Sequence, residues 1–237
     1  MSSLVSYRRH DAIATITLDD GKRNVLSVDM FAAIAAALDR AESDGVTVVL
    51  TGREGVFSAG FDLRVLMAGG EDAYRMVRTG FELAERLLAF PTPVVVACTG
   101  HALAMGVFLV LAGDYRLGAA GPYKIGATEV ALGITMPHFG VEICRQRLTP
   151  AYFHRAVINA EVYGPEEAAD AGFLDRVVSA GDLAAIAHDV AAGLAKLDAG
   201  VHAATKLRAR GPALKAVRAA IEADAVAFAA MRSRVSS

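Results

Sequence analysis

The sequence predicts an α/β protein, and three features carry this prediction. Two short apolar runs, residues 46–50 and 94–98, have the length and composition of buried strands. Segments with a helical hydrophobic period, most clearly residues 71–88, alternate with them, as is typical of layered α/β folds. The chain has 237 residues, of which 54% are hydrophobic, which suffices for one domain with a large core.

The N-terminal part of the chain is predicted to form a strand followed by a helix. In residues 12–18 a set that includes threonines (Ile13, Thr15, Thr17) alternates with a purely apolar set (Ala14, Ile16, Leu18), as in a strand whose two faces have different surroundings. Residues 19–22, Asp-Asp-Gly-Lys, read as a turn. Ser27 is a good N-cap for a helix over residues 28–42, because its hydroxyl can accept a backbone N–H in the first turn.

The middle of the chain repeats this alternation. Gly69 and Gly70 interrupt the chain before the amphipathic helix at 71–88, and Pro91 and Pro93 prevent that helix from continuing. The second apolar strand follows directly.

The next segments are a turn, a helix and a long irregular stretch. Residues 99–101 turn the chain, residues 103–112 are predicted to form an apolar helix, and residues 115–118 a short strand. Residues 121–140 are irregular and contain several glycines and prolines. Connections of this length are often functional.

The remaining segments are predicted to be helical. Helices are expected over residues 141–148 and 150–158, and Pro165 opens a further helix that Gly172 ends. Ala, Leu, Val and basic residues then dominate a helical pattern from residue 181 onward.

This change of composition divides the chain into a core, residues 1–180, and a C-terminal helical region, residues 181–237. The helices of the second part are expected to pack on something beyond their own strands, as a separate subdomain or an oligomer interface. Lys206 in this region is interpreted as a surface charge.

Composition also excludes several classes of protein. A net charge of −2 argues against electrostatic binding of nucleic acid. No apolar run approaches the roughly 18 to 20 residues that span a bilayer, so no membrane association is expected. Residues 1–10 lack an apolar signal core, which predicts a cytoplasmic protein. Cys98 and Cys144 are the only cysteines, and their spacing predicts no zinc site.

The most informative stretch follows the first apolar strand. Ser58, Ala59 and Gly60 permit a sharp turn, after which the N–H of Phe61 can point into a cleft and hold a developing oxyanion. Taken alone, the stretch is better explained as a plain strand-to-helix turn.

Two further stretches extend this pattern. Residues 99–106 again join an apolar strand to the start of a helix, so the N–H of Met105 is a second candidate donor. Residues 126–134 place a single carboxylate, Glu129, among apolar neighbours, which should raise its pKa toward the range useful for acid/base work.

Together these stretches resemble the enoyl-CoA hydratase/isomerase family, also called the crotonase family. Residues 57–63 are similar to its first oxyanion segment, residues 100–106 to its second, and residues 129–133 to the segment with the second catalytic glutamate. Residues 164–178 also match at the expected distance. The resemblance covers about residues 10 to 180, with a compatible helical tail.

The resemblance implies a core of stacked ββα turns with a C-terminal trimerisation region. It implies an acyl-CoA thioester as substrate, coenzyme A being part of that substrate, and neither a metal nor a redox cofactor. It implies a homotrimer or a hexamer built from trimers. The thioester oxygen would lie between the N–H groups of Phe61 and Met105.

The sequence departs from the family's hydratases at one position. Those enzymes use two glutamates, and the first corresponds here to Phe108, which cannot transfer a proton. Glu129 matches the second. One carboxylate suffices to move a double bond, by taking a proton from C2 of a 3-enoyl-CoA and returning one at C4. The favoured reaction is therefore isomerisation to the 2-enoyl-CoA.

The resemblance also gives a set of substrate-binding candidates. Asn24 and Val25 are similar to a segment lining the adenine pocket, and Arg64 stands where a basic residue often meets the CoA phosphates or is simply a solvated charge. Asp62 is interpreted chiefly as a local cap. The full set is Asn24, Val25, Ala59, Asp62, Arg64, Phe108 and His138, of which His138 either faces the acyl pocket or is an ordinary loop histidine.

Two other functions stay open. The chain could be a 2-enoyl-CoA hydratase with a displaced second acid/base, for which Glu142, expected at the start of a helix, and His138 are the nearest candidates. It could also be a non-catalytic acyl-CoA-binding protein that keeps the amides but lacks the chemistry. Lys206 could alternatively reach the CoA of a neighbouring chain.

Overall fold

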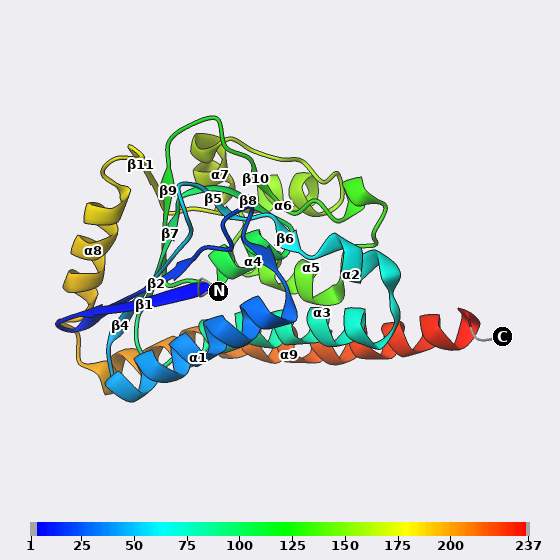
Figure 1. The fold of residues 1–237 in the computed structure, drawn as a ribbon, viewed down its shortest axis with the longest axis horizontal. Helices are drawn as coiled ribbons and strands as arrows, with labels where there is room; N and C mark the ends of the chain where they lie inside the picture. Colours follow the sequence, from blue (N-terminus) through cyan, green and yellow to red (C-terminus); the bar gives the residue numbers. More distant parts are fainter. Residues whose placement is uncertain (1–3, 236–237) are drawn as a thin grey trace.

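The computed structural model describes residues 4–235 and contains one large sheet (Figure 1). Its strands lie in the order β1-β2-β4-β7-β9-β11, and only β1 and β2 pair antiparallel. The strands are β1 (Val5–His10), β2 (Ile13–Leu18), β4 (Thr47–Thr51), β7 (Val94–Cys98), β9 (Tyr115–Ala119) and β11 (Arg176–Val178). The apolar strands predicted from the sequence are all members of this sheet.

A smaller layer of strands stands beside the large sheet. It contains a parallel three-stranded sheet in the order β10-β8-β5, and a parallel pair formed by β3 and β6. These strands are β5 (Gly55–Ser58), β8 (Gly100–Leu103), β10 (Ile125–Gly126), β3 (Val25–Leu26) and β6 (Gly60–Phe61). Three pairs of consecutive strands follow one pattern: β4/β5, β7/β8 and β9/β10. In each pair the first strand belongs to the large sheet and the second to the small sheet, and helical segments follow. The α/β class predicted from the sequence and the ββα repeat implied by the family resemblance are both confirmed.

The helices cover both faces of the large sheet. They are α1 (Val28–Asp44), α2 (Leu63–Ala68), α3 (Gly70–Leu88), α4 (Met105–Ala112), α5 (His138–Arg145), α6 (Pro150–Val157), α7 (Pro165–Ala171), α8 (Leu183–Leu194) and α9 (Ala199–Val235), with a short 3₁₀ turn, η1 (Val130–Leu132). Ser27 caps α1 as predicted, since its hydroxyl accepts the N–H of Met30 at 3.2 Å. Within residues 4–235 no helix combines the length and the apolar character needed to cross a membrane.

Strand β7 shows how the two-residue period of a strand builds two cores. Every residue of β7 is buried. Val94 and Val96 face the main core, whereas Val95 and Ala97 face a second cluster on the other side of the sheet. A strand buried on both faces has no polar face, which explains its uniformly apolar sequence.

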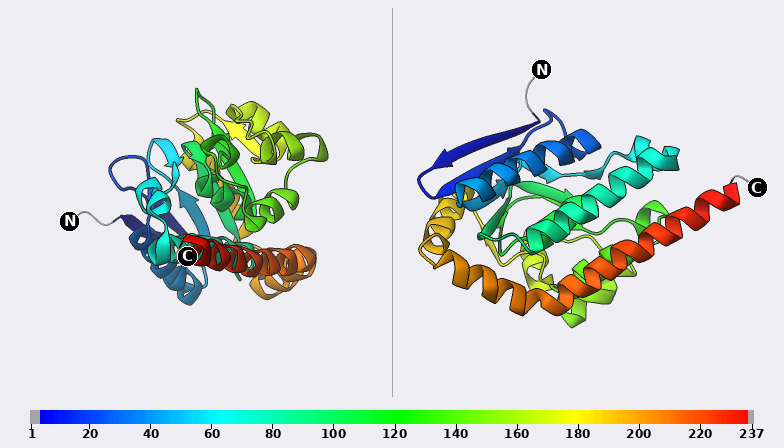
Figure 2. Two further views of the ribbon diagram at one scale, coloured as in Figure 1. Left: turned by 90° about the vertical axis from the view of Figure 1, so that its right-hand side faces the viewer. Right: turned by 90° about the horizontal axis from the view of Figure 1, so that it is seen from below.

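Helix α8 supplies the cover for this second face. Its residues Leu183, Ala187 and Ala191 are buried in the same cluster as Val95 and Leu117 of the sheet. The sequence analysis expected the region after residue 181 to pack on something other than the strands of this chain. For α8 this expectation is wrong, because α8 packs on the large sheet. Helix α9 then runs the length of the molecule alongside α3 and against α5 (Figures 1 and 2). A role of this region in oligomerisation stays a prediction.

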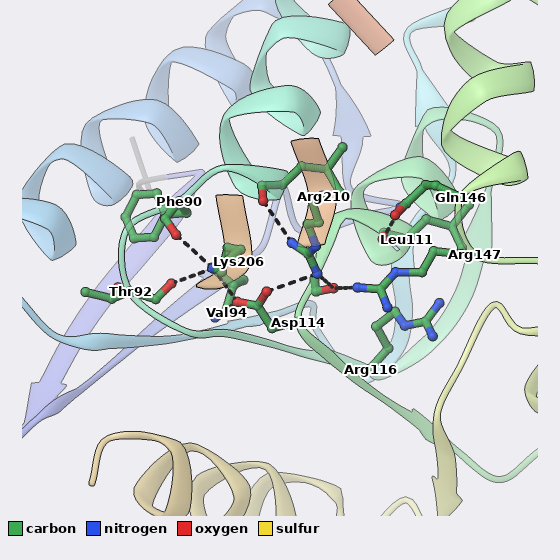
Figure 3. A network of polar contacts seen from close by, with 12 residues as sticks. Phe90, Thr92, Val94, Leu111, Asp114, Arg116, Gln146, Arg147, Lys206 and Arg210 are labelled. Atoms are coloured by element: carbon green, nitrogen blue, oxygen red, sulfur yellow. Dashed lines mark hydrogen bonds and ion pairs between the residues drawn. The ribbon is translucent and has the colours of Figure 1, made fainter. Parts of the chain in front are cut away.

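Asp114, directly before β9, ties α9 to the sheet (Figure 3). Its carboxylate accepts the backbone N–H of Val94 at 2.7 Å and contacts Lys206 at 2.6 Å and Arg210 at 3.0 Å. Lys206 also donates to the carbonyls of Phe90 at 2.7 Å and Thr92 at 3.0 Å. Lys206 is only 6% exposed, so its interpretation as a surface charge was wrong. Ammonium groups are buried only when such acceptors surround them.

Two helix starts and one strand illustrate where the structure differs from the sequence prediction. Leu103 belongs to strand β8 rather than to a helix, and α4 begins at Met105. Helix α5 begins at His138, three positions earlier than predicted, so Glu142 lies inside it and not at its start. Strand β1 was not predicted, because the polar residues of its exposed face mask the alternation.

Candidate active site

The three segments singled out in the sequence follow three neighbouring strands. Strands β5, β8 and β10 are parallel neighbours in the small sheet. Phe61 follows the end of β5, Met105 the end of β8, and Glu129 the end of β10. Because the carboxyl ends of adjacent parallel strands meet at one edge of a sheet, the topology brings the three segments to the same edge.

The first turn is held by Ser58. Its hydroxyl donates to the carbonyl of Asn24 at 2.7 Å and accepts the N–H of Gly60 at 3.0 Å. Gly60 has a φ of +91°, which favours glycine because a Cβ would clash with the backbone. Asp62 then caps α2 by accepting the N–H of Arg64 at 2.9 Å, the local role expected for it.

The second turn contains a strained residue. Ala104 has a φ of +48° and a ψ of −127°, a conformation that residues with a Cβ rarely adopt. Its N–H donates to the carbonyl of Gly126 at 3.1 Å, and its carbonyl accepts the N–H of Val107 at 3.0 Å. These bonds hold the backbone directly before Met105, the first residue of α4. The N–H of a first helical residue has no acceptor within its own helix.

The two turns lie in direct backbone contact. A Cβ placed on Gly60 would lie 2.9 Å from the carbonyl oxygen of Leu103 and 3.4 Å from the nitrogen of Met105. A Cβ on Gly106 would lie 2.6 Å from the carbonyl oxygen of Ser58. Neither glycine therefore has room for a side chain, and the amides of the two turns are held close to one another.

Glu129 is a buried carboxylate, and no described residue forms an ion pair with it. It is 6% exposed, and its Oε2 atom is buried and makes no hydrogen bond within the described residues. Burial raises the pKa of Glu129 from 4.5 to about 7. A hydrogen bond from its own backbone N–H lowers the pKa, but by less than burial raises it. Its charge adds to the effect of burial in raising the pKa of Cys144, which places the carboxylate near α5. A carboxyl group with such a pKa can both take up and release a proton at neutral pH.

Phe108 belongs to a continuous group of aromatic rings behind the two turns. It is fully buried and meets Phe139 of α5 edge-on, with 5.8 Å between the ring centres. Phe139 stacks on Phe81 at 4.2 Å, and Phe81 contacts Phe61 of the first turn at 6.1 Å. Phe108 therefore places an apolar ring, packed against α5, next to the second turn.

Asn24 has a structural role in this arrangement. Its side chain is fully buried, donates to the carbonyls of Leu18 at 2.9 Å and Phe57 at 3.1 Å, and accepts the N–H of Asp20 at 3.0 Å. These bonds leave its amide no free atom for a ligand. Val25 is half-buried beside it, in the strand that pairs with β6, and Ala59 is also half-buried in the first turn.

The remaining candidates lie at the surface. The Arg64 side chain is 91% exposed and pairs with Asp62 at 3.1 Å. His138 is exposed and begins α5, so it is a helical and not a loop residue. Glu142 is half-buried and pairs with Arg145 at 3.3 Å.

Sequence reasoning missed the contributions of α3 and α5 to this region. Phe81 and Phe139 were not among the predicted site residues, although each lies within one ring contact of a candidate site residue. Asp224 of α9 was not considered at all, and it binds the first turn of α5. Only the pairing of distant segments reveals these contacts, so no local sequence signal could have found them.

The raised pKa of Glu129 predicts that replacing it by glutamine stabilises the fold at neutral pH. Its carboxyl group keeps its proton up to about pH 7 in the folded chain, whereas the unfolded chain releases it near pH 4.5. Between these values the folded state binds more protons, so the wild type loses stability as the pH rises. The loss reaches about 3 kcal/mol above pH 7. Urea unfolding should therefore show E129Q more stable than the wild type at pH 8 and nearly equal at pH 4.5; equal stability at pH 8 contradicts the shift.

Comparison with solved structures identifies close relatives of this arrangement. The chain is similar to an enoyl-CoA isomerase of Mycobacterium tuberculosis, with 47% identity, a TM-score of 0.91 and coverage of 95% of this chain and 99% of the other. It is also similar to human mitochondrial delta3-delta2-enoyl-CoA isomerase, with 26% identity, a TM-score of 0.90 and coverage of 98% and 93%.

Sequence comparison leads to the same group of enzymes. A probable enoyl-CoA hydratase of Mycobacterium tuberculosis, EchA17, is 30% identical over 214 residues, which cover 87% of this chain and 79% of the relative. Residues 8–236 match the family model described as enoyl-CoA hydratase/isomerase. Since that match spans nearly the whole sequence, the chain belongs to the enoyl-CoA hydratase/isomerase family.

Proposed function

We propose that the protein is an acyl-CoA isomerase that converts a 3-enoyl-CoA into the 2-enoyl-CoA. The observation that carries this proposal is Glu129, a buried carboxylate with a pKa of about 7 that follows β10, the strand paired with β8. Phe108 stands where the family's hydratases have their other glutamate.

In this proposal Glu129 acts as base and then as acid. Its carboxylate takes a proton from C2 of the 3-enoyl thioester, and the electrons move onto the thioester oxygen. The same carboxyl group then gives a proton to C4, and the double bond is left between C2 and C3. The substrate and the product are isomers, so no water, electron acceptor or other reactant is needed.

The negative charge of the dienolate would be held by two backbone amides, those of Phe61 and Met105. The close contact between the two turns supports this role, because it keeps both amides in fixed positions before the charge develops. One donor of this kind contributes roughly 3 to 4 kcal/mol to stabilising the transition state. The strained backbone at Ala104 is consistent with such a function.

The CoA part of the substrate would extend from the first turn toward the surface. Val25 and Ala59 are the half-buried residues available there, and Arg64 presents an exposed guanidinium suited to a phosphate. Asp62 orients this guanidinium through its own hydrogen bonds. Asn24 contributes indirectly, by holding the first turn.

Hydration is the second candidate, and the position of Phe108 weighs against it. Addition of water needs a group that holds and polarises the water. Phe108 offers only an apolar ring edge, and the Glu142 carboxylate is paired with Arg145. Binding without catalysis, the third candidate, gives no reason for a buried carboxylate that destabilises the fold.

Product analysis distinguishes the three functions. We expect purified protein to convert a 3-enoyl-CoA into the 2-enoyl-CoA and to form little 3-hydroxyacyl-CoA from a 2-enoyl-CoA, as followed by chromatography of the thioesters. Rapid formation of the 3-hydroxyacyl-CoA would establish a hydratase instead. Tight binding of both thioesters with no turnover of either would establish a non-catalytic binder.

A further inference from the structure

Helix α5 receives its N-terminal cap from a distant helix. Its own N-cap is Pro137, which makes no capping side-chain bond, although the first N–H groups of a helix need acceptors. Asp224 of α9 supplies them. Its Oδ1 accepts the N–H of His138 at 2.9 Å and its Oδ2 accepts the N–H of Phe139 at 2.9 Å. A carboxylate at this end also interacts favourably with the helix dipole.

The helix that Asp224 holds forms one wall of the candidate active site. Phe139, whose N–H bonds to Asp224, meets Phe108 edge-on and stacks on Phe81. The next residue, Gly140, is so close to Phe108 that a Cβ there would lie 3.1 Å from the ring. Cys144, one turn further along, is the residue affected by the charge of Glu129. A shift of α5 would therefore displace the Phe108 ring and change the electrostatic surroundings of Glu129.

The segment that carries Glu129 depends on its two ends for its position. Strand β10 fixes one end by pairing with β8, and α5 fixes the other. Between them, η1 buries none of its three side chains, and both Val130 and Leu132 are exposed. Glu129 itself is buried, but the residues directly after it add no buried packing, so the anchors at either end contribute to the position of the carboxylate.

We infer that Asp224 is a positioning residue for catalysis, through which the C-terminal helix holds α5 and hence Glu129 in place. This inference rests on the proposed function, since it assigns Asp224 a part in the step that Glu129 performs. Asp224 does not touch the reacting atoms; it acts through the two N–H groups that it accepts.

The chain offers a matched control on the same helix. Glu222 also reaches from α9 to a neighbouring element, but it pairs with Arg78 of α3 at 2.9 Å and is exposed. Replacing Glu222 by glutamine removes a charge from α9 at nearly the same place and leaves the cap of α5 intact. An exposed ion pair of this kind contributes little to stability.

The test compares Asp224→Asn with Glu222→Gln in the full-length protein. We expect D224N to lower kcat for a 3-enoyl-CoA by about 10- to 100-fold, because small displacements of a catalytic group have effects of this size. KM and the Kd of a saturated acyl-CoA should change by less than about twofold, since the contacting turns are not altered. Hydrogen exchange of residues 127–139 should be faster in D224N. In E222Q all of these quantities should match the wild type.

The outcomes separate this inference from the function on which it rests. A folded D224N with wild-type kcat overturns the inference, and so does an equal loss of kcat in E222Q. If D224N does not fold, D224S, whose hydroxyl can accept only one of the two N–H groups, is judged by the same criteria. Glu129→Gln is assayed in parallel: full activity of E129Q overturns the proposed function, whereas an inactive E129Q with a fully active D224N overturns this inference alone.

Discussion

Replacement of Glu129 by glutamine is expected to lower the turnover of a 3-enoyl-CoA by about 10²- to 10⁴-fold, the usual contribution of a general acid/base. Glutamine has nearly the same shape but cannot take up the C2 proton. The loss should appear in kcat, measured by steady-state kinetics. The Kd of the acyl-CoA should stay close to the wild-type value, because the backbone amides of Phe61 and Met105 are untouched.

Glu142→Gln provides the matched control for this loss. Glu142 is the nearest other carboxylate in the sequence, and it is paired with Arg145. We expect E142Q to turn over substrate at the wild-type rate. An active E129Q together with an inactive E142Q would transfer the acid/base role to Glu142 and revive the hydratase interpretation.

Replacement of Asp114 by asparagine is expected to destabilise the fold by about 3–5 kcal/mol, the typical effect of removing one member of a buried ion pair. The amide can still accept the N–H of Val94. It leaves Lys206 and Arg210, both largely buried, without their shared carboxylate (Figure 3). Urea unfolding monitored by circular dichroism measures the effect.

Two further variants test the origin of this instability. Asp39→Asn removes an exposed carboxylate paired with Arg86 and should change the free energy of unfolding by no more than about 1 kcal/mol. Combining D114N with Lys206→Met should recover part of the lost stability, because the buried ammonium is then gone. A D114N protein as stable as the wild type would contradict the view that this cluster anchors α9.

The strands and helices were predictable where a local feature of the sequence, such as an apolar run or a capping residue, marks them. Strand β7 is buried on both faces and therefore reads as an unbroken apolar run, and Ser27 marks the start of α1 by a local capping bond. The start of α5 was missed for the opposite reason. Its cap comes from Asp224, 86 residues away, so no signal for it exists near His138.

The turns of the candidate site were predictable from glycine and small residues, whereas their surroundings were not. Gly60 needs a positive φ, and that requirement shows in the local sequence. The burial of Lys206 by Asp114 and two carbonyls depends on segments about 90 to 120 residues apart, which local patterns cannot relate. The ring contacts of Phe108 are hidden in the same way.

The fate of the hydrogen at C2 tests the central claim most directly, because the claim is that one carboxylate removes it and returns a hydrogen at C4. A 3-enoyl-CoA carrying deuterium at C2 is incubated with the protein in ordinary water, and the product is analysed by NMR. Since Oε2 of Glu129 is buried, we expect its proton to exchange with solvent more slowly than the transfer, so part of the deuterium lost from C2 should appear at C4. A product whose C4 hydrogen comes entirely from water, formed equally fast by wild type and E129Q, would contradict the account.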